Sequence, residues 1–384
     1  MDLDNTKQDK VRGCLMAGAA GDALGYEVEF MSRRIILARF GEQGITEFAL
    51  DSNGKALVSD DTQMTLFTAN GLLNAPRLAV EPRYAVVRAY VDWFYTQTRG
   101  KNRMKSCWLS DIPALHSLRA PGNTCMSALD VIARGGEPSN NSKGCGGIMR
   151  VAPIALYAAV RNDFDDIAVA RLAADAAECT HLHPLGFLPA ALFALLLYKV
   201  TSMSASLVRE EFDHIVAGTL DVLDAVYDGK YVQDRRYLRE LTEKAISLAH
   251  SDIADADAVR VLGEGWVAEE TWAIALYCAI RHMDSVEDAI TASVNHDGDS
   301  DSTGSVCGNI MGAIYGYEHI KERNIFCSDG RELEETLELS EVILAIADDL
   351  VTGCPIGRDG KLDTPEKRQW YDRYYKMIPS GIGR

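Results

Sequence analysis

The sequence predicts an all-α fold, and three observations support this prediction. Apolar residues recur at helical spacing in long runs along the chain. Alternating strand patterns are scarce, and the best candidate, GITEFAL at residues 44–50, is weak. No linker rich in Pro, Gly or Ser divides the 384 residues. We therefore expect one compact domain over residues 1–384, with residues 355–384 as a candidate C-terminal extension.

The expected helices follow from the apolar runs in chain order. These runs are residues 11–24, 62–73, 84–95, 166–179, 188–200, 271–282, 306–320 and 333–350. The first is rich in Ala and Gly, which lets helices approach closely. The most apolar stretch, FLPAALFALLLYKV, is too short to span a bilayer, so we expect a buried helix. Residues 56–61 and 135–147 are expected to form loops.

Charge and cysteine usage restrict the class of partner and the compartment. A net charge of −17 disfavours nucleic acid and anionic membranes as partners, since both are polyanions. It remains compatible with a phosphate-bearing ligand held by cations and backbone amides. The nine cysteines include no CxxC pair, and the start, MDLDNTKQDK, has no signal-peptide pattern. These features predict a cytoplasmic protein with reduced cysteines.

The stretch NHDGDSDSTG, residues 295–304, places Asp297, Asp299 and Asp301 at alternate positions directly before a helical run. Carboxylates this close repel one another unless positive charge lies among them. A calcium loop of the EF-hand type counted from Asp297 would need Gly at position 6 and Glu at position 12. The chain has Ser302 and Gly308 there, so we exclude this type of site.

A second stretch, SDDTQMTLF at residues 59–67, also gathers oxygen ligands before a helix. Helix capping explains one acidic residue well, but it explains adjacent aspartates poorly. The pattern alone leaves capping or surface acidity open against metal binding. If the two stretches meet, their hard oxygens suit two Mg²⁺ or Mn²⁺ ions. The candidate ligands are Ser59, Asp60, Asp61, Asp299, Asp301 and Ser302.

Five blocks together resemble the ADP-ribosylglycohydrolase family, which includes dinitrogenase reductase-activating glycohydrolases and ADP-ribosylarginine hydrolases. They are GAAGDALGYEVEF, SDDTQM, GCGGIMRVAP, THLHPLG and HDGDSDSTG, and they occur in the family's order between residues 18 and 304. The resemblance implies a compact all-α fold with a dinuclear metal centre in a cleft. It also implies that the six candidate ligands above hold the metals.

The resemblance assigns further roles. Glu29 matches the family's mobile glutamate, with Glu27 as the near competitor. Gly144, Gly146 and Gly147 match a loop that lies along ADP-ribose. Asn123 is a candidate ligand contact, close to Ala120, which stands where the nitrogenase-regulating members carry an acidic residue.

Other residues have two readings. In THLHP we favour His183 over His181 as a supporting ligand contact. Asp22 either supports the metal ligands or bonds locally. Trp266 and Tyr277 either stack on adenine or, as their helical spacing favours, pack in the core.

The expected activity is a metal-dependent hydrolase that removes ADP-ribose from a protein side chain. Asp61 or Asp299 would take a proton from water, and Glu29 would gate access or orient the ligand. The motif that contains Ser302 favours the N-glycosidic bond to arginine, with serine-linked groups open. Two alternatives remain. One is a binding or immunity protein that docks to an ADP-ribosyltransferase toxin, and the other is a different metal-dependent hydrolase such as a phosphatase.

Overall fold

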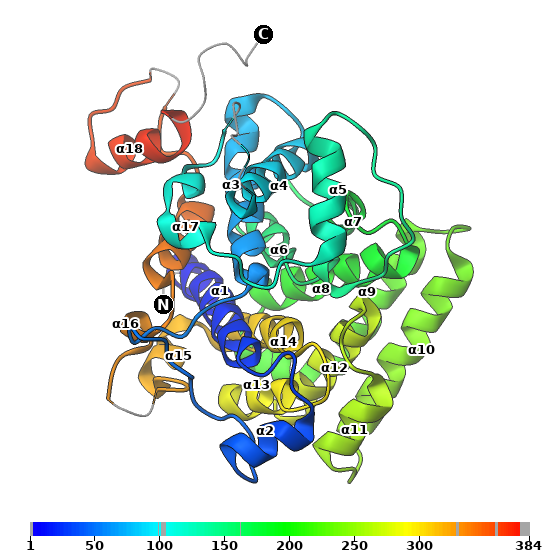
Figure 1. Cartoon of the computed structure of the whole chain (residues 1–384). Helices are drawn as coiled ribbons and strands as arrows, with labels where there is room; N and C mark the ends of the chain where they lie inside the picture. The colour runs from blue at the N-terminus through cyan, green and yellow to red at the C-terminus, as the bar shows by residue number, and fades with distance from the viewer. Residues whose placement is uncertain are drawn as a thin grey trace.

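The computed structural model describes residues 3–98, 100, 105–161, 163–327, 330–357 and 360–376. Over these residues the chain forms eighteen α-helices, with four short 3₁₀ or π turns and no β-strand (Figure 1). Two isolated bridges, between Ala56 and Leu337 and between Gly144 and Val267, are its β-type pairings in the described part of the chain. The all-α prediction is therefore confirmed.

The first half of the chain contains α1 (Leu3–Tyr26), α2 (Arg33–Phe40), α3 (Asp60–Leu78), α4 (Pro82–Gln97), η1 (Trp108–Asp111), η2 (Pro113–His116), α5 (Asn123–Ala133), η3 (Cys145–Gly147), α6 (Ala152–Ala159), α7 (Asp166–Glu178) and α8 (Pro184–Ser202). The second half contains α9 (Ala205–Val226), α10 (Val232–Ala249), α11 (Asp255–Leu262), α12 (Ala268–Arg281), α13 (Val286–Val294), α14 (Ser300–Tyr315), α15 (Tyr317–Arg323), α16 (Leu333–Thr336), α17 (Ser340–Thr352), α18 (Pro365–Trp370) and η4 (Tyr371–Tyr375).

The weak strand candidate does not form, and two helix predictions are wrong. Residues 44–50 form no strand, because the side chain of Asn295 pairs with both backbone groups of Ile45 at 2.8 and 2.9 Å and holds the segment as a loop. The run 306–320 is broken at Gly316, whose φ of 82° is left-handed, so it ends α14 before α15 begins. The run 333–350 is broken where Leu339 adopts a φ of 62°.

Helices α1 and α14 pack along each other at the centre of the molecule (Figure 1). A Cβ added at Gly308 would lie 2.1 Å from the backbone oxygen of Ala17, and one at Gly21 would lie 2.1 Å from that of Gly304. Glycine is required on both helices because the two backbones approach too closely for side chains. We call the contact formed by Gly13, Gly18, Gly21, Gly25, Gly304, Gly308 and Gly312 the glycine seam.

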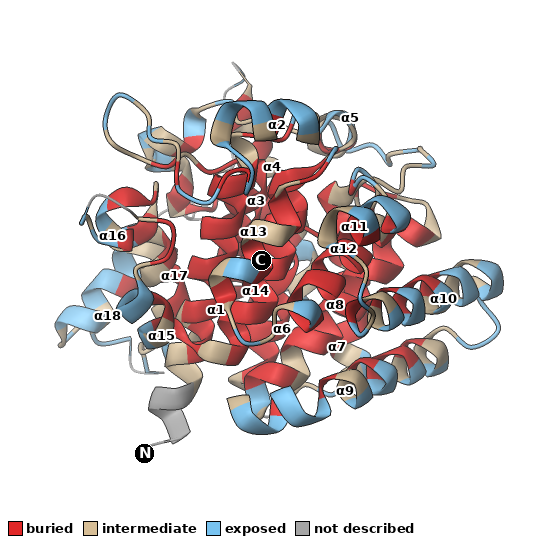
Figure 2. Ribbon diagram, turned by 90° about the horizontal axis from the view of Figure 1, so that it is seen from below, coloured by how far each residue is buried: buried red, intermediate tan, exposed pale blue. Residues whose placement is uncertain are grey.

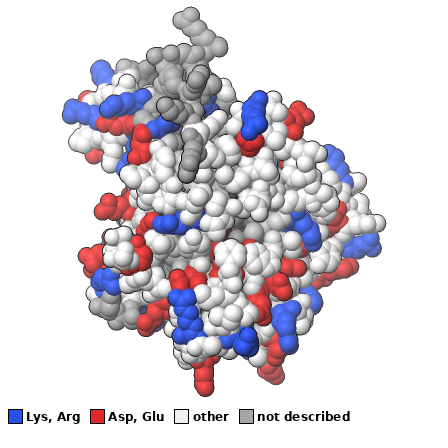
Figure 3. Space-filling view, in the orientation of Figure 1, with Lys and Arg blue, Asp and Glu red and all other residues white. Residues whose placement is uncertain are grey.

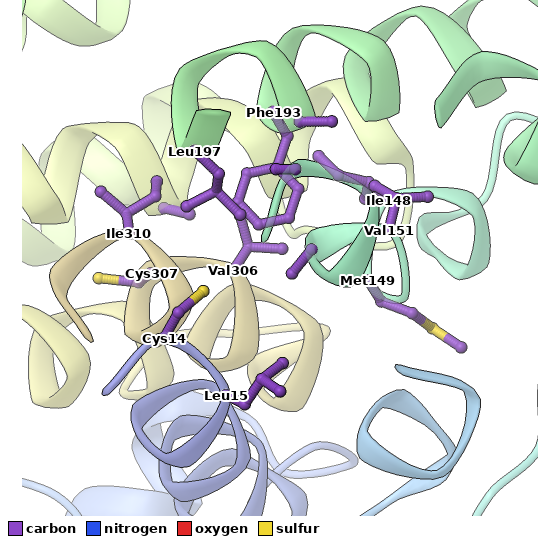
Figure 4. Packing of buried hydrophobic residues seen from close by; sticks show 14 of the residues in the cluster. Cys14, Leu15, Ile148, Met149, Val151, Phe193, Leu197, Val306, Cys307 and Ile310 are labelled. Carbon is purple, nitrogen blue, oxygen red and sulfur yellow. The ribbon is translucent and has the colours of Figure 1, made fainter. Parts of the chain in front are cut away.

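The hydrophobic core surrounds this seam, and helices α1, α8, α12 and α14 are buried over most of their length (Figure 2). Lys, Arg, Asp and Glu side chains are scattered over the outer face (Figure 3). Phe193 and Leu197 of α8 face Val306 of α14 in the interior (Figure 4). Helix α8, with 19 residues, is long and apolar enough to cross a membrane, but 83% of its most apolar window is buried in the protein. It is the buried helix that the sequence predicts.

Part of the expected C-terminal extension, residues 355–384, lies within the described residues. Residues 360–376 contact α17, where Asp349 accepts hydrogen bonds from Arg373 at 2.6 Å and from Tyr374 at 2.7 Å. Residues 358, 359 and 377–384 lie outside the described residues.

Candidate metal centre and active-site cleft

The N-terminus of α14 carries the carboxylates of the stretch 295–304. Asp299 is the N-cap residue, and both Asp299 and Asp301 accept a hydrogen bond from the amide of Ser302, at 3.3 and 2.9 Å. Gly298 before them has a φ of 128°, and a Cβ there would lie 2.0 Å from the oxygen of Glu264. This glycine lets the chain turn so that both aspartates face the same cavity.

The N-terminus of α3 is held by a carboxylate from α1. Asp22 is fully buried and accepts hydrogen bonds from the amides of Ser59 and Thr62, both at 3.0 Å, and from the Thr62 hydroxyl. Ser59 caps α3 by accepting from the amide of Asp61 at 3.1 Å. Of the two roles that the sequence leaves open, Asp22 has the supporting one, because it fixes the helix end that presents Asp60 and Asp61.

Both helix ends and the segment after α1 meet at one cavity of about 190 Å³. The carboxylates that line it are Glu29, Asp60, Asp61, Asp299 and Asp301. Oxygens of Glu29, Asp299 and Asp301 lie within 4.8 Å of one another. Glu27 instead pairs with Arg39 and does not line the cavity, so Glu29 is the glutamate that reaches it.

The charges of these carboxylates are not balanced by basic side chains. No lysine or arginine is among the described residues that line the cavity. Burial, followed by the charge of Asp301, raises the pKa of Glu29 to about 10. The same two causes, in the same order, raise the pKa values of Asp60, Asp61 and Asp299 well above the usual range. Bound cations would remove this penalty, because they supply the missing positive charge.

The donor atoms fit divalent cations. Oxygens Oε2 of Glu29 and Oδ2 of Asp61 are buried and have no hydrogen-bond partner. A buried carboxylate oxygen without a partner is costly in a folded protein, so each one is a vacant acceptor aimed into the cavity. A set made of carboxylates with the Ser302 hydroxyl is hard-oxygen ligation, which suits Mg²⁺ or Mn²⁺. Ser59 is buried and does not line the cavity.

The glycine loop and the start of α5 also line the cavity, and they contribute Gly144, Gly146 and Asn123. A Cβ at Gly146 would lie 2.8 Å from the sulfur of Cys125 and 2.9 Å from Cε1 of His181. The amides of Gly144 and Cys145 donate to the Ser142 hydroxyl and to the oxygen of Trp266. These two amides are therefore not free to bind a ligand, and what the loop contributes to the cavity is space.

Gly147, from the same loop, does not line the cavity. A Cβ there would lie 2.5 Å from the backbone oxygen of Gly186, so this glycine permits close packing against the start of α8.

The two histidines of THLHP have different places. His183 is the N-cap of α8 and accepts from the amide of Leu185 at 3.0 Å, away from the cavity. His181 lines the cavity, and its Nδ1 lies 2.9 Å from the Thr180 hydroxyl. Burial, followed by the charge of Arg150, lowers the pKa of His181 to about 3, so the ring stays neutral. The Pro184 that follows His183 is the available signal, because Pro at the first helical position marks its predecessor as the cap.

The two aromatic candidates, Tyr277 and Trp266, lie in different environments. Tyr277 is buried, and its hydroxyl donates to Asp255 at 2.7 Å. The prediction that Trp266 packs in the core is wrong, since it is 39% exposed at the cavity and stacks on Phe30 with ring centroids 6.1 Å apart. It follows a left-handed Gly265, which turns the ring outward before α12 begins. Ala120, with a φ of 54°, also lines the cavity.

Sequence reasoning missed five lining residues, which are Gly122, Thr124, Cys125, Cys145 and Met149. Each stands within two positions of a residue that the resemblance selects, and that proximity is the one signal the sequence offers.

Comparisons with known proteins agree with this geometry. The sequence model of the ADP-ribosylglycohydrolase family matches residues 3–358. The proteins named ADP-ribosylhydrolase ARH3 from Bos taurus and Mus musculus are 28% and 30% identical over 54% and 50% of this chain. These matches span 60% and 54% of the two relatives' own lengths.

A solved structure titled "ADP-ribosylglycohydrolase-related protein complex" has the same fold. Its TM-score is 0.57 at 22% identity, and the match covers 91% of this chain and 99% of that one.

Proposed function

This chain belongs to the ADP-ribosylglycohydrolase family, and from this premise we propose that it is a hydrolase that releases ADP-ribose from modified protein side chains. The observation that carries the proposal is the buried carboxylate cluster at the ends of α3 and α14. The unpartnered oxygens of Glu29 and Asp61 belong to residues that line a cavity, and a glycine wall formed by Gly144 and Gly146 lines the same cavity.

The cluster would hold two divalent cations, Mg²⁺ or Mn²⁺. The proposed ligands are Ser59, Asp60, Asp61, Asp299, Asp301 and Ser302. Ser59 does not line the cavity, and its hydroxyl caps the turn of α3 that carries Asp60 and Asp61. Such ions supply positive charge that lowers the pKa of bound water and binds ribose hydroxyls.

The chain's own residues would do the remaining work. Asp61 is the stronger candidate to accept a proton from the attacking water, because its Oδ2 has no other partner, whereas Asp299 caps α14. As the glycosidic bond loosens, positive charge develops on the ribose, and the surrounding carboxylates would stabilise it. Glu29 lies at the cavity wall beside the exposed Phe30, where it would orient the ligand at the entrance.

The glycine wall would accommodate the rest of the ADP-ribose. Gly144 and Gly146 leave space, and Asn123 and neutral His181 offer hydrogen bonds along the same wall. The neutral imidazole suits a site that already carries many carboxylates, since it can donate through one nitrogen without adding charge.

The linkage that we propose first is the N-glycosidic bond to arginine, because of the motif that contains Ser302. The proposed comparison substrate is serine-linked ADP-ribose. A cytoplasmic location and the lack of nucleic-acid and membrane partners stay predictions from the charge and composition.

The test is release of ADP-ribose from arginine-modified and serine-modified proteins, each with Mg²⁺, with Mn²⁺ and with chelator. We expect cation-dependent release from at least one substrate and its loss in Asp301→Asn. Tight binding of a modified protein or a toxin without release would favour the docking alternative. Release of phosphate instead of ADP-ribose would favour a phosphatase.

A further inference from the structure

A second, larger cavity of about 1120 Å³ lies next to the cleft. It is bounded by α2, by α11, by the segment that leads into α12, and by the residues just before the α14 aspartates. Its walls include Arg33, Arg34, Lys143, Arg260, Trp266 and Asp297. We call this cavity the acceptor groove.

The groove continues the cleft, because the two share a wall. Trp266 lines both cavities. Lys143 precedes Gly144 of the cleft directly, and Asp297 stands two residues before Asp299. The stacked pair of Phe30, which is 74% exposed, and Trp266 forms an apolar rim between them. A ligand that leaves the cleft at this rim enters the groove.

Most charged side chains in the groove are already engaged. Arg260 pairs with Asp257 at 2.6 Å, and Lys143 pairs with Glu269. Glu270 accepts from the amides of Glu264 and Gly265 at 3.0 and 3.2 Å. These groups therefore have little charge left to offer a ligand.

Two arginines at the start of α2, unlike Arg260 and Lys143, have no acidic partner in the described part of the chain. Among the described residues, neither Arg33 nor Arg34 has an acidic side-chain partner, and Nε of Arg33 is buried without any acceptor. Asp297 accepts from the backbone amide of Arg33 at 2.8 Å rather than from its side chain. Glu264 also lines the groove and is exposed. Among the described acidic lining residues, it is the one whose carboxylate neither accepts from a backbone amide nor pairs with a basic side chain. The α2 edge therefore offers two unpaired positive charges.

We propose that the acceptor groove binds the polypeptide that carries the ADP-ribose, and that Arg33 and Arg34 select an acidic residue close to the modified side chain. This inference rests on the proposed function. The cleft, at about 190 Å³, has no room for a protein backbone beside the ADP-ribosyl group, whereas the groove, at about 1120 Å³, is larger and begins at the rim of the cleft. A carboxylate in the groove would give the two arginines the acceptor that they lack.

The negative net charge of the protein affects how the two arginines would act on an acidic segment. With a net charge of −17, the protein as a whole repels an acidic substrate. Helix α2 carries three arginines and no acidic residue, whereas α11, on the other flank of the groove, carries Arg260 together with Asp255 and Asp257. A local pair of positive charges in a negative field sets the register and orientation of a bound segment more than its total affinity.

The test uses two peptides that carry the same ADP-ribosylated residue, one with aspartates beside it and one with neutral residues. We expect the full-length protein to show a kcat/KM about tenfold higher for the acidic peptide, and Arg33→Glu/Arg34→Glu to remove or invert that ratio. Added salt should reduce the preference as well. Acidic residues in the first turn suit a helix dipole, so α2 should still form in this variant.

The control variant is Arg236→Glu/Arg323→Glu, which makes the same change in net charge on α10 and α15, outside the groove. It should keep the wild-type ratio. Arg34→Glu alone, at an exposed position, repeats the test if the double variant is unstable.

Free ADP-ribosylated amino acid, which has no flanking residues, separates the outcomes. Its hydrolysis should be unchanged in the Arg33 and Arg34 variant. A loss there would mean that the groove holds the nucleotide itself, and it would overturn the inference. Equal rates for both peptides in wild type would also overturn it, whereas no hydrolysis of any substrate would instead reject the proposed function.

Discussion

Helices α1 and α14 meet in two regions that have opposite chemistry. Along the glycine seam the two backbones touch, and no side chain separates them. At one end of the seam, beside Gly21 and Gly25, Asp22 of α1 and Asp301 of α14 belong to a buried cluster of carboxylates. The same helix pair thus serves packing where side chains are absent and chemistry where charges are concentrated. Substitutions in the two regions should have opposite effects on stability.

The largest effect is expected in the seam. Gly308→Ala would place a Cβ 2.1 Å from the backbone oxygen of Ala17, so the helices must separate. We expect the free energy of unfolding to fall by about 3 kcal/mol, measured by chemical denaturation.

A matched control is Gly218→Ala in α9, where an added Cβ meets nothing within 4 Å. This change should stabilise the protein by up to about 1 kcal/mol, because alanine favours a helix interior over glycine. Equal losses in both variants would show that close approach of the helices is not what the seam glycines provide.

The cleft should respond in the opposite way. Asp301→Asn removes a charge whose repulsion raises the pKa values of five neighbouring carboxylates (Asp22, Glu29, Asp60, Asp61 and Asp299). Without divalent cations, the variant should therefore unfold at the same temperature as wild type or at a higher one. Hydrolysis should fall at least about 100-fold, or about 2.7 kcal/mol in transition-state stabilisation.

The same variant gives a second readout. Mg²⁺ or Mn²⁺ should raise the melting temperature of wild type but not that of Asp301→Asn, because ligands that bind the folded state stabilise it. A variant that is less stable than wild type in chelator, and that is still stabilised by the cations, would contradict the contrast with the seam.

A smaller effect on stability is expected from the titration of His181, which lines the cleft. The pKa of His181 is about 3 in the folded protein and about 6.5 in an unfolded chain. Between these values the unfolded chain binds a proton that the folded protein does not, so stability is lost as the pH falls from 6.5. Between pH 6 and pH 5, wild type should lose about 1 kcal/mol more than His181→Gln, measured by denaturant unfolding.

The control for this prediction is His116→Gln, at an exposed histidine of η2. That variant should keep the wild-type dependence on pH. Parallel pH curves for wild type and His181→Gln would show that this ring is not held neutral by burial.

The sequence predicts the features that depend on local pattern. Helical periodicity locates the buried helices, and two clusters of oxygen ligands before apolar runs locate the ends of α3 and α14. Prediction from the sequence fails where contacts between distant residues determine the conformation. Asn295 holds Ile45 in a loop across 250 residues of chain, and the left-handed Leu339 divides one apolar run into two helices.

The details of the cleft depend on similar long-range contacts. Trp266 faces outward although its spacing suits a core residue, because Gly265 turns the chain before α12. His181 and His183 stand two positions apart, and Pro184 makes His183 the N-cap of α8, so His181 is the histidine that lines the cavity. The acceptor groove joins α2 to α11 and α12, which are more than 200 residues apart, so no local motif could reveal it.

The central claim is that carboxylates from α3 and α14 form one two-cation centre. The most direct measurement is the number of Mn²⁺ ions bound per chain, by equilibrium dialysis of wild type and Asp301→Asn. We predict two saturable ions for wild type and loss of at least one in the variant. No saturable binding to wild type, or equal binding by both proteins, would contradict the claim.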